Sequence, residues 1–191
     1  MITHYLSQFD KAIYDTNCIV YYRFNFQEKY KGKIFSIFHP FHSKIDKLTS
    51  KILNEKWHIY TIKIAWEEIQ NKGIAVIVED LLKEKGLYTE IIARRLSQKL
   101  LNSLNDLKSK SWFIIEDFLP SDDRLDQVKQ FYINLPDSSE KKRLIDKNRR
   151  PFPSYVDLSL IVYSKKIRGL LVSTDHDICD FKDELEKNNL C

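Results

Sequence analysis

Short apolar runs alternate along this chain with longer segments whose apolar residues recur at helical spacing. Four runs have the length and composition of buried strands: residues 12–14, 57–64, 112–115 and 169–173. Because helical segments separate these strands, the connections between them must cross over, and crossover connections give parallel pairing. The pattern therefore predicts an α/β fold, a three-layer α/β/α sandwich around a central, mostly parallel sheet.

The segments between the strands carry the helical signals. Ser43 and Asp46 form a capping-box pattern that predicts the start of one helix, and Gly86 separates two amphipathic segments. The expected helices span about residues 44–55, 65–71, 74–85, 90–108, 122–134, 138–147 and 155–166.

The length and apolar content of the chain indicate a single domain. Its 191 residues lie within the usual range for one domain, and no linker or internal repeat divides them. We expect insertions around residues 24–56 and 80–130 within this domain. The apolar helices at 74–108 are expected to pack on the core, although a protein partner or a second copy of the chain, forming a homodimer, would also fit them.

Composition excludes several classes of protein. The four glycines lie too far apart for a phosphate-cradling loop, which counts against ATPases, kinases and dinucleotide enzymes. The three cysteines include no CxxC pair, so neither a zinc site nor a disulfide framework is expected. This cysteine usage, with no secretory signal and no apolar run of membrane-spanning length, predicts a cytoplasmic protein without a membrane partner. The net charge of +4 is compatible with an anionic partner.

Acidic residues occur where the predicted strands end. Asp15 follows the first strand and Asp175 follows the last, while Glu68 and Asp157 lie on helices adjoining strands. Ligands of parallel α/β sheets bind beyond the carboxyl ends of the strands, so these four carboxylates are expected to converge. Clustered carboxylates repel one another unless a cation neutralises them, and Mg²⁺ or Mn²⁺ accepts such oxygen ligands.

Four segments resemble the signature segments of the PIN-domain nucleases, in the order that this family has them. They are AIYDTNCIVYY (12–22), AWEEIQ (65–70), PSYVDLSLIVYSKK (153–166) and GLLVSTDHDICDF (169–181). The resemblance implies a ribonuclease whose Mg²⁺ or Mn²⁺ ligands are Asp15, Glu68, Asp157, Asp175 and Asp177. Glu67 is the alternative to Glu68. Residues 16, 17, 173 and 174 would orient the ligands or phosphate oxygens.

The implied reaction is hydrolysis of RNA phosphodiester bonds by an activated water. Many small PIN-domain proteins are toxins controlled by an antitoxin, so the resemblance also suggests a protein partner of that kind or another regulator. Glu68, however, lies 53 positions after Asp15, and Asp157 lies 89 positions after Glu68. These long intervals depart from the small toxins and are compatible with an RNA-processing nuclease carrying an elaborated substrate-facing lobe.

Other interpretations remain open at this stage. The acidic residues would also serve as helix caps, Asx turns or solvated surface. A basic group precedes the third segment and would either track an RNA backbone or remain solvated: Lys141, Lys142, Arg143, Lys147, Arg149 and Arg150. A PIN-like module that binds RNA or protein without cleaving is the main alternative function. A haloacid dehalogenase-type phosphohydrolase ranks below it, because the first strand is followed by Asp-Thr-Asn rather than Asp-x-Asp.

Overall fold

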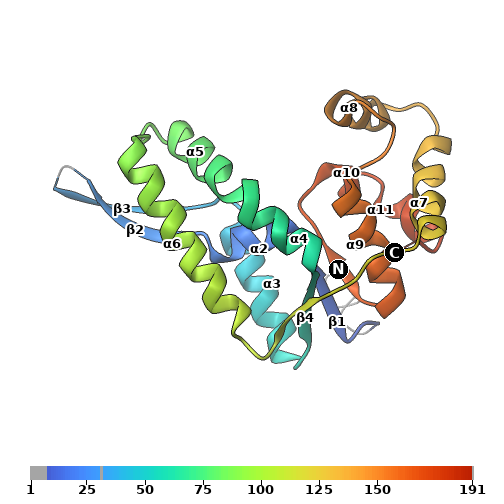
Figure 1. Cartoon of the computed structure of the whole chain (residues 1–191), viewed down its shortest axis with the longest axis horizontal. Coiled ribbons are helices and arrows are strands. Elements are labelled where there is room, and N and C mark those ends of the chain that lie inside the picture. Colours follow the sequence, from blue (N-terminus) through green and yellow to red (C-terminus); the bar gives the residue numbers. More distant parts are fainter. Residues whose placement is uncertain (1–7, 31, 191) are drawn as a thin grey trace.

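The central sheet is parallel throughout, as the alternation of strands and helices predicts. The computed structural model describes residues 8–30 and 32–190. Within them the sheet comprises β1 (Lys11–Tyr14), β4 (His58–Ile62), β5 (Phe113–Glu116) and β6 (Leu170–Val172). The strand order is β5-β4-β1-β6, with every neighbouring pair parallel. Helices lie on both faces of this sheet (Figure 1), which confirms the predicted three-layer α/β/α sandwich.

The chain reverses its direction of travel across the sheet at β1. From β1 it moves outward to β4 and β5, and then it returns to the other side of β1 for β6. The connections that leave the carboxyl ends of β1 and β6 therefore diverge, and such a divergence forms the ligand crevice of open α/β sheets. Tyr14 pairs with Val172, so the two strands end at the same level. The residues that follow them are brought together at this crevice.

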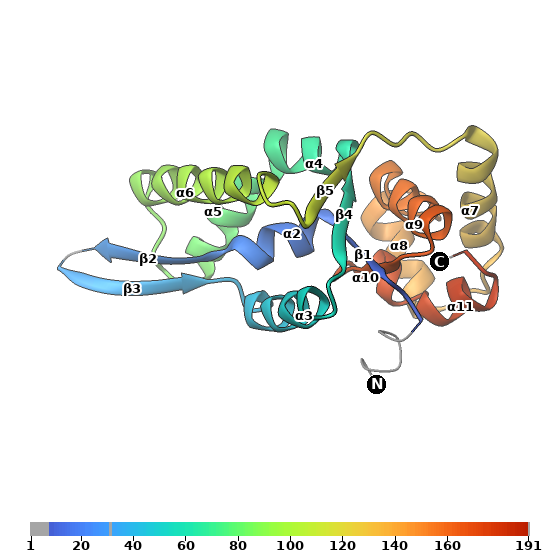
Figure 2. The ribbon, with the colours of Figure 1, turned by 90° about the horizontal axis from the view of Figure 1, so that it is seen from below.

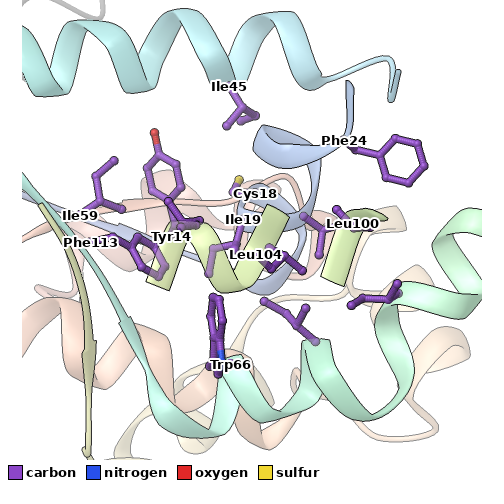
Figure 3. Packing of buried hydrophobic residues seen from close by; sticks show 14 of the residues in the cluster. Tyr14, Cys18, Ile19, Phe24, Ile45, Ile59, Trp66, Leu100, Leu104 and Phe113 are labelled. Carbon is purple, nitrogen blue, oxygen red and sulfur yellow. The ribbon is translucent and has the colours of Figure 1, made fainter. Parts of the chain in front are cut away.

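Successive strand residues face opposite sides of the sheet, as the pleat requires. Ala12 and Tyr14 join the larger core, together with α2 (Thr16–Arg23), α3 (His42–Asn54) and α6 (Glu90–Lys108). Figure 3 shows the ring of Tyr14 in this core. The Tyr14 hydroxyl is hydrogen-bonded to Thr49 on α3 at 2.8 Å, which satisfies a polar group that burial removes from water.

The opposite face of the sheet is covered by α9 (Tyr155–Ile167), which is apolar on both of its sides. Leu160 and Tyr163 pack with Ile13 of the sheet, while Leu158 and Ile161 belong to a second core. The helices that complete this second core are α7 (Asp122–Asn134), α8 (Ser139–Asn148), α10 (His176–Cys179) and α11 (Lys182–Lys187). Because α9 lies between two cores, its sequence shows little polar face.

A lobe projects from the sheet on the side of the larger core (Figure 2). It contains the hairpin of β2 (Asn25–Tyr30) and β3 (Lys33–Phe38) together with α5 (Ile74–Glu84) and α6. Glu28 of the hairpin has 4% of its side chain exposed and pairs with Lys99 and Arg95 of α6, the latter at 3.5 Å. This ion-pair group holds the hairpin against α6.

Most described residues of the regions expected as insertions lie in helices and strands. Residues 24–56 contain the hairpin and α3, and residues 80–130 contain the end of α5, all of α6 and β5, and most of α7. Within the described parts of the chain, no helix combines the length and apolar character needed to cross a bilayer.

Several element boundaries differ from the sequence-based prediction. α3 begins at His42 with Phe41 as its N-cap, and no side chain caps it. The expected capping box was therefore wrong, because Ser43 already lies inside the helix. β4 ends at Ile62, since α4 (Lys63–Glu68) begins directly after it and continues through the π-helix η1 (Ile69–Gly73) into α5. The pattern predicted neither α10 nor α11, because both are too short to show helical periodicity.

Candidate metal site

Asp15 joins the carboxyl ends of the two central strands. It is the N-cap of α2, where its Oδ1 accepts a hydrogen bond from the Cys18 backbone N–H at 2.6 Å. Its Oδ2 accepts hydrogen bonds from the Ser173 hydroxyl and from the Thr174 backbone N–H. Burial raises the pKa of the Asp15 carboxyl, and these hydrogen bonds oppose that rise. The predicted first ligand is thus 3% exposed and held from both strands.

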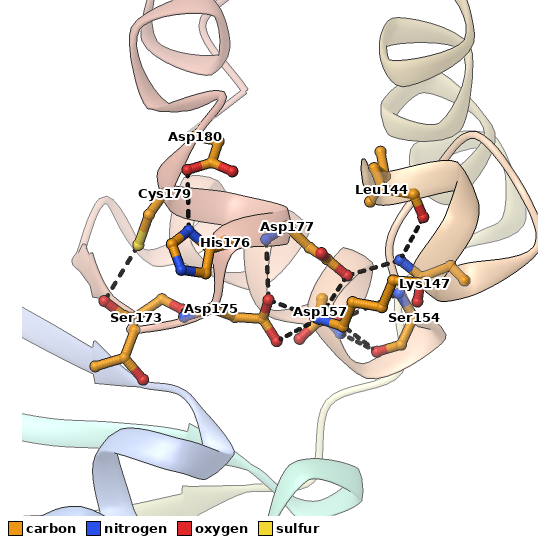
Figure 4. Close-up of polar contacts among 12 residues, drawn as sticks. Leu144, Lys147, Ser154, Asp157, Ser173, Asp175, His176, Asp177, Cys179 and Asp180 are labelled. Atoms are coloured by element: carbon orange, nitrogen blue, oxygen red, sulfur yellow. Dashed lines mark hydrogen bonds and ion pairs between the residues drawn. The ribbon is translucent and has the colours of Figure 1, made fainter. Parts of the chain in front are cut away.

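Three further carboxylates meet beside the end of β6 (Figure 4). Asp175 is the N-cap of α10, Asp177 lies in its first turn, and Asp157 lies in the first turn of α9. One oxygen from each lies within 4.8 Å of the others. Two oxygens that share one Mg²⁺ at about 2.1 Å lie at most about 4.2 Å apart. The trio therefore fits a divalent ion after a small contraction, and the tertiary structure brings together three of the five predicted ligands.

The electrostatics of Asp157 show how much negative charge gathers here. Its Oδ2 accepts hydrogen bonds from the Ser154 hydroxyl at 2.7 Å and backbone N–H at 3.3 Å, as in a capping box. Burial raises the pKa of Asp157 to about 6, although the Ser154 bond lowers it, and Asp175, Asp15 and Asp177 raise it further. Such mutual repulsion is what a bound cation would relieve, because it favours the ionised form of every carboxylate around it.

Two side chains from α8 stabilise these carboxylates, one through its positive charge and one through a hydrogen bond. The Lys147 ammonium lies 2.9 Å and 3.1 Å from the two oxygens of Asp175 and 3.0 Å from Oδ2 of Asp177. Asn148 donates a hydrogen bond to the same Asp177 oxygen at 2.7 Å. Partial burial by itself would lower the pKa of Lys147, but the hydrogen bonds to the two carboxylates raise it. Lys147 is therefore a charged partner of two candidate ligands.

Glu68 lies beside Asp15 but outside the trio. Its Oε2 accepts a hydrogen bond from the hydroxyl of Thr16, the residue that follows Asp15, at 2.9 Å. Both Glu67 and Glu68 are exposed at the end of α4. Glu68 is the residue that reaches the start of α2, and this position favours it over Glu67 as the acidic residue of the second segment that acts with Asp15.

The remaining basic residues near the site are partly engaged in ion pairs. Arg143 of α8 pairs with Asp180, and the His176 imidazole lies 3.1 Å from the same carboxylate. Lys142 and Arg149 are exposed to solvent. A phosphate contact by His176 would therefore have to compete with Asp180.

The sequence indicated one of the two remaining features of the site and missed the other. A helix-capping role for Asp157 was one of the interpretations that the sequence left open, and the structure shows a capping box between Ser154 and Asp157. The pairing of Lys147 and Asn148 with Asp177 had no signal in the sequence, because α8 and α10 are brought together only by the second core.

No protein-family model, curated protein or solved structure matches this chain. The candidate function accordingly rests on the residues and their geometry.

Proposed function

We propose that this chain is a Mg²⁺- or Mn²⁺-dependent endoribonuclease of the PIN-domain type. One observation carries the proposal: the carboxylates of Asp157, Asp175 and Asp177 lie together at the crevice where the strand order reverses, and the nearby charge of Asp15 raises the pKa of Asp157. Asp15 contributes a carboxylate at the end of β1, the strand at which the strand order reverses. Asp157, Asp175 and Asp177 contribute the clustered oxygens. The ligand crevice of this fold class lies at the same place.

In this proposal, some residues would bind the metal ion, and others would orient a carboxylate or the attacking water. Asp157, Asp175 and Asp177 would hold the ion, with Asp15 completing its surroundings. The chemistry supplied by a bound divalent ion is Lewis-acid stabilisation of the phosphate and acidification of a water. Ser173 and Thr174 keep the Asp15 carboxylate in one orientation through their hydrogen bonds. Glu68, which accepts a hydrogen bond from Thr16, is exposed to solvent beside the start of α2 and can accept a proton or position the attacking water.

A polyanionic substrate is favoured by the charge around the crevice. α8 carries exposed basic residues beside the acidic cluster, among them Lys142, and Arg149 follows it directly. Phosphates of a nucleic acid on either side of the scissile bond would lie near these cations, and binding would weaken as salt rises. The choice of RNA over DNA comes from the family resemblance.

The proposal is tested by incubating labelled single-stranded and structured RNA with the protein in Mg²⁺, Mn²⁺ or EDTA. Asp15→Asn and Asp175→Asn should each abolish cleavage, and EDTA should do so for the wild type. Asp146→Asn, an exposed change on α8, is the matched control and should cleave normally. Cleavage that persists in both site variants would refute the site.

A second function has one observation in its favour. Lys147 pairs with Asp175 and Asp177 and Asn148 donates to Asp177, and these contacts from α8 would also stabilise the carboxylates in a PIN-like module that binds RNA or protein and does not cleave. Absence of cleavage in all metals, together with retained RNA binding, would support this alternative.

A further inference from the structure

α8 contacts the metal site through side chains of its last two turns. Arg143 pairs with Asp180, Lys147 pairs with Asp175 and Asp177, and Asn148 donates to Asp177. Figure 4 shows the Lys147 side chain extending across to these carboxylates. The ammonium of Lys147 therefore lies among the oxygens that the proposed ion would use.

We infer that Lys147 is an exchangeable counter-ion of the metal site, displaced by the divalent ion and then free to bind the scissile phosphate. The inference rests on the proposed function and assigns to Lys147 a role that the acidic residues cannot supply. Lys147 would stabilise the metal-free site first and become a phosphate-binding residue second.

Coulomb repulsion makes the two cations mutually exclusive at these oxygens. An ammonium that stays about 3 Å from a carboxylate oxygen would be within a few ångströms of a divalent ion bound to the same oxygen. Asp175 and Asp177 are the only carboxylates that Lys147 pairs with among the described residues, so it loses both contacts together. Metal binding must therefore overcome the Lys147 ion pairs.

The side chain of Lys147 can move without disrupting the fold. Half of it is exposed, at 49%, whereas Lys141 and Leu144 are the buried residues of α8. Leu144 packs in the second core, and the Lys141 ammonium donates hydrogen bonds to the backbone carbonyls of Ile133 and Leu135, so α8 can stay in place while the Lys147 ammonium changes partner. A lysine released in this position faces the crevice, where a phosphate offers several strong acceptors.

The test is calorimetric titration of Mn²⁺ into the full chain without RNA. Lys147→Met removes the competing charge and keeps the length of the side chain, so the Kd for Mn²⁺ should fall roughly three- to tenfold. Lys147→Arg keeps the charge and should remain near the wild-type affinity. Lys108→Met, an exposed change on α6, is the matched control and should leave the affinity unchanged.

Cleavage at saturating Mn²⁺ supplies the second readout. Lys147→Met should cleave RNA at least about tenfold more slowly than the wild type, because the phosphate loses its cation. Tighter metal binding together with slower cleavage is a pair of effects that a purely structural lysine would not produce. Thermal unfolding of each variant verifies that the fold is retained.

The outcomes separate this inference from the proposed function. If Lys147→Met binds Mn²⁺ no more tightly than the wild type while the wild type cleaves RNA, the counter-ion role is wrong and the nuclease stands. If the affinity rises but cleavage is unchanged, the phosphate role is wrong. If no variant binds Mn²⁺, both the inference and the proposed metal site are overturned.

Discussion

The Ser173 hydroxyl donates a hydrogen bond to Oδ2 of Asp15, and 158 positions of sequence separate the two residues. The same hydroxyl oxygen accepts a hydrogen bond from the backbone N–H of Asp175 at 2.9 Å. Ser173 thus connects the carboxylate at the end of β1 to the backbone of a candidate ligand after β6. This link holds the two central strands in register at the crevice.

We expect Ser173→Ala to destabilise the fold by about 1–3 kcal/mol, because Asp15 loses a donor and the Asp175 N–H loses its acceptor. The free energy of unfolding is measured by urea titration. Ser50→Ala, an exposed change on α3, is the control and should lie within about 0.5 kcal/mol of the wild type. In the Asp15→Asn background the effect of Ser173→Ala should shrink, and equal effects in both backgrounds would contradict the link.

Asp157→Asn is expected to stabilise the metal-free protein above pH 6. Burial raises the pKa of Asp157 in the folded protein to about 6 from its usual value of 3.8, so the folded wild type loses stability as pH rises through this window. The loss amounts to roughly 3 kcal/mol at neutral pH, reduced by the favourable charge of Asp157 at the start of α9. Asparagine keeps the bond to Ser154 and carries no such penalty.

The comparison is made by urea unfolding in EDTA at pH 4 and at pH 7.5. The free energy of unfolding of the variant should be larger than that of the wild type at pH 7.5, and this difference should decrease toward pH 4. Adding Mn²⁺ should reduce the difference in free energy of unfolding at pH 7.5, because the ion stabilises the wild type more than the variant. A variant that is less stable than the wild type at pH 7.5 in EDTA would mean that Asp157 is not under electrostatic strain.

Glu68 and Glu67 provide a matched pair of variants at adjacent positions. Glu68→Gln should lower RNA cleavage by about tenfold or more, because the carboxylate held by Thr16 loses its charge beside Asp15. Glu67→Gln should retain most of the wild-type activity. The measurement is the initial rate of RNA cleavage at saturating Mn²⁺. If Glu67→Gln cleaves more slowly than Glu68→Gln, then Glu67 and not Glu68 has the catalytic role.

Substituting alanine at two glycines should change the free energy of unfolding in opposite directions. At Gly169, just before β6, a Cβ would lie 2.2 Å from the buried Cδ1 of Ile13, so Gly169→Ala should destabilise by about 1–3 kcal/mol. Gly73 has a helical backbone, and a Cβ there would lie 3.8 Å from the backbone oxygen of Glu68, an ordinary van der Waals distance. Gly73→Ala should therefore stabilise by about 0.5–1 kcal/mol. Thermal unfolding of both variants provides the measurement, and a neutral Gly169→Ala would show that Ile13 can repack.

The strands of the central sheet and the longer helices were predictable because they depend on local patterns, whereas α2 and the β2–β3 hairpin were not predicted. The spacing of Leu96, Leu100 and Leu104 predicted α6 with its correct ends, and the apolar run before Asp15 predicted β1. The parallel sheet followed from the alternation of elements alone. The start of α3 was missed because Phe41 caps it by backbone position, without the side-chain bond that a sequence can signal.

The sequence by itself determined the class of fold and the acidic residues that follow β1 and β6, since both depend on neighbours along the chain. Only the tertiary structure decided which groups meet. Asp157 reaches Asp175 because α9 packs between two cores, and Lys147 reaches both Asp175 and Asp177 because Leu144 anchors α8 on the second core. Burial of apolar surface drives that packing without regard to sequence distance, so the charge balance of the site follows from the fold and not from any local motif.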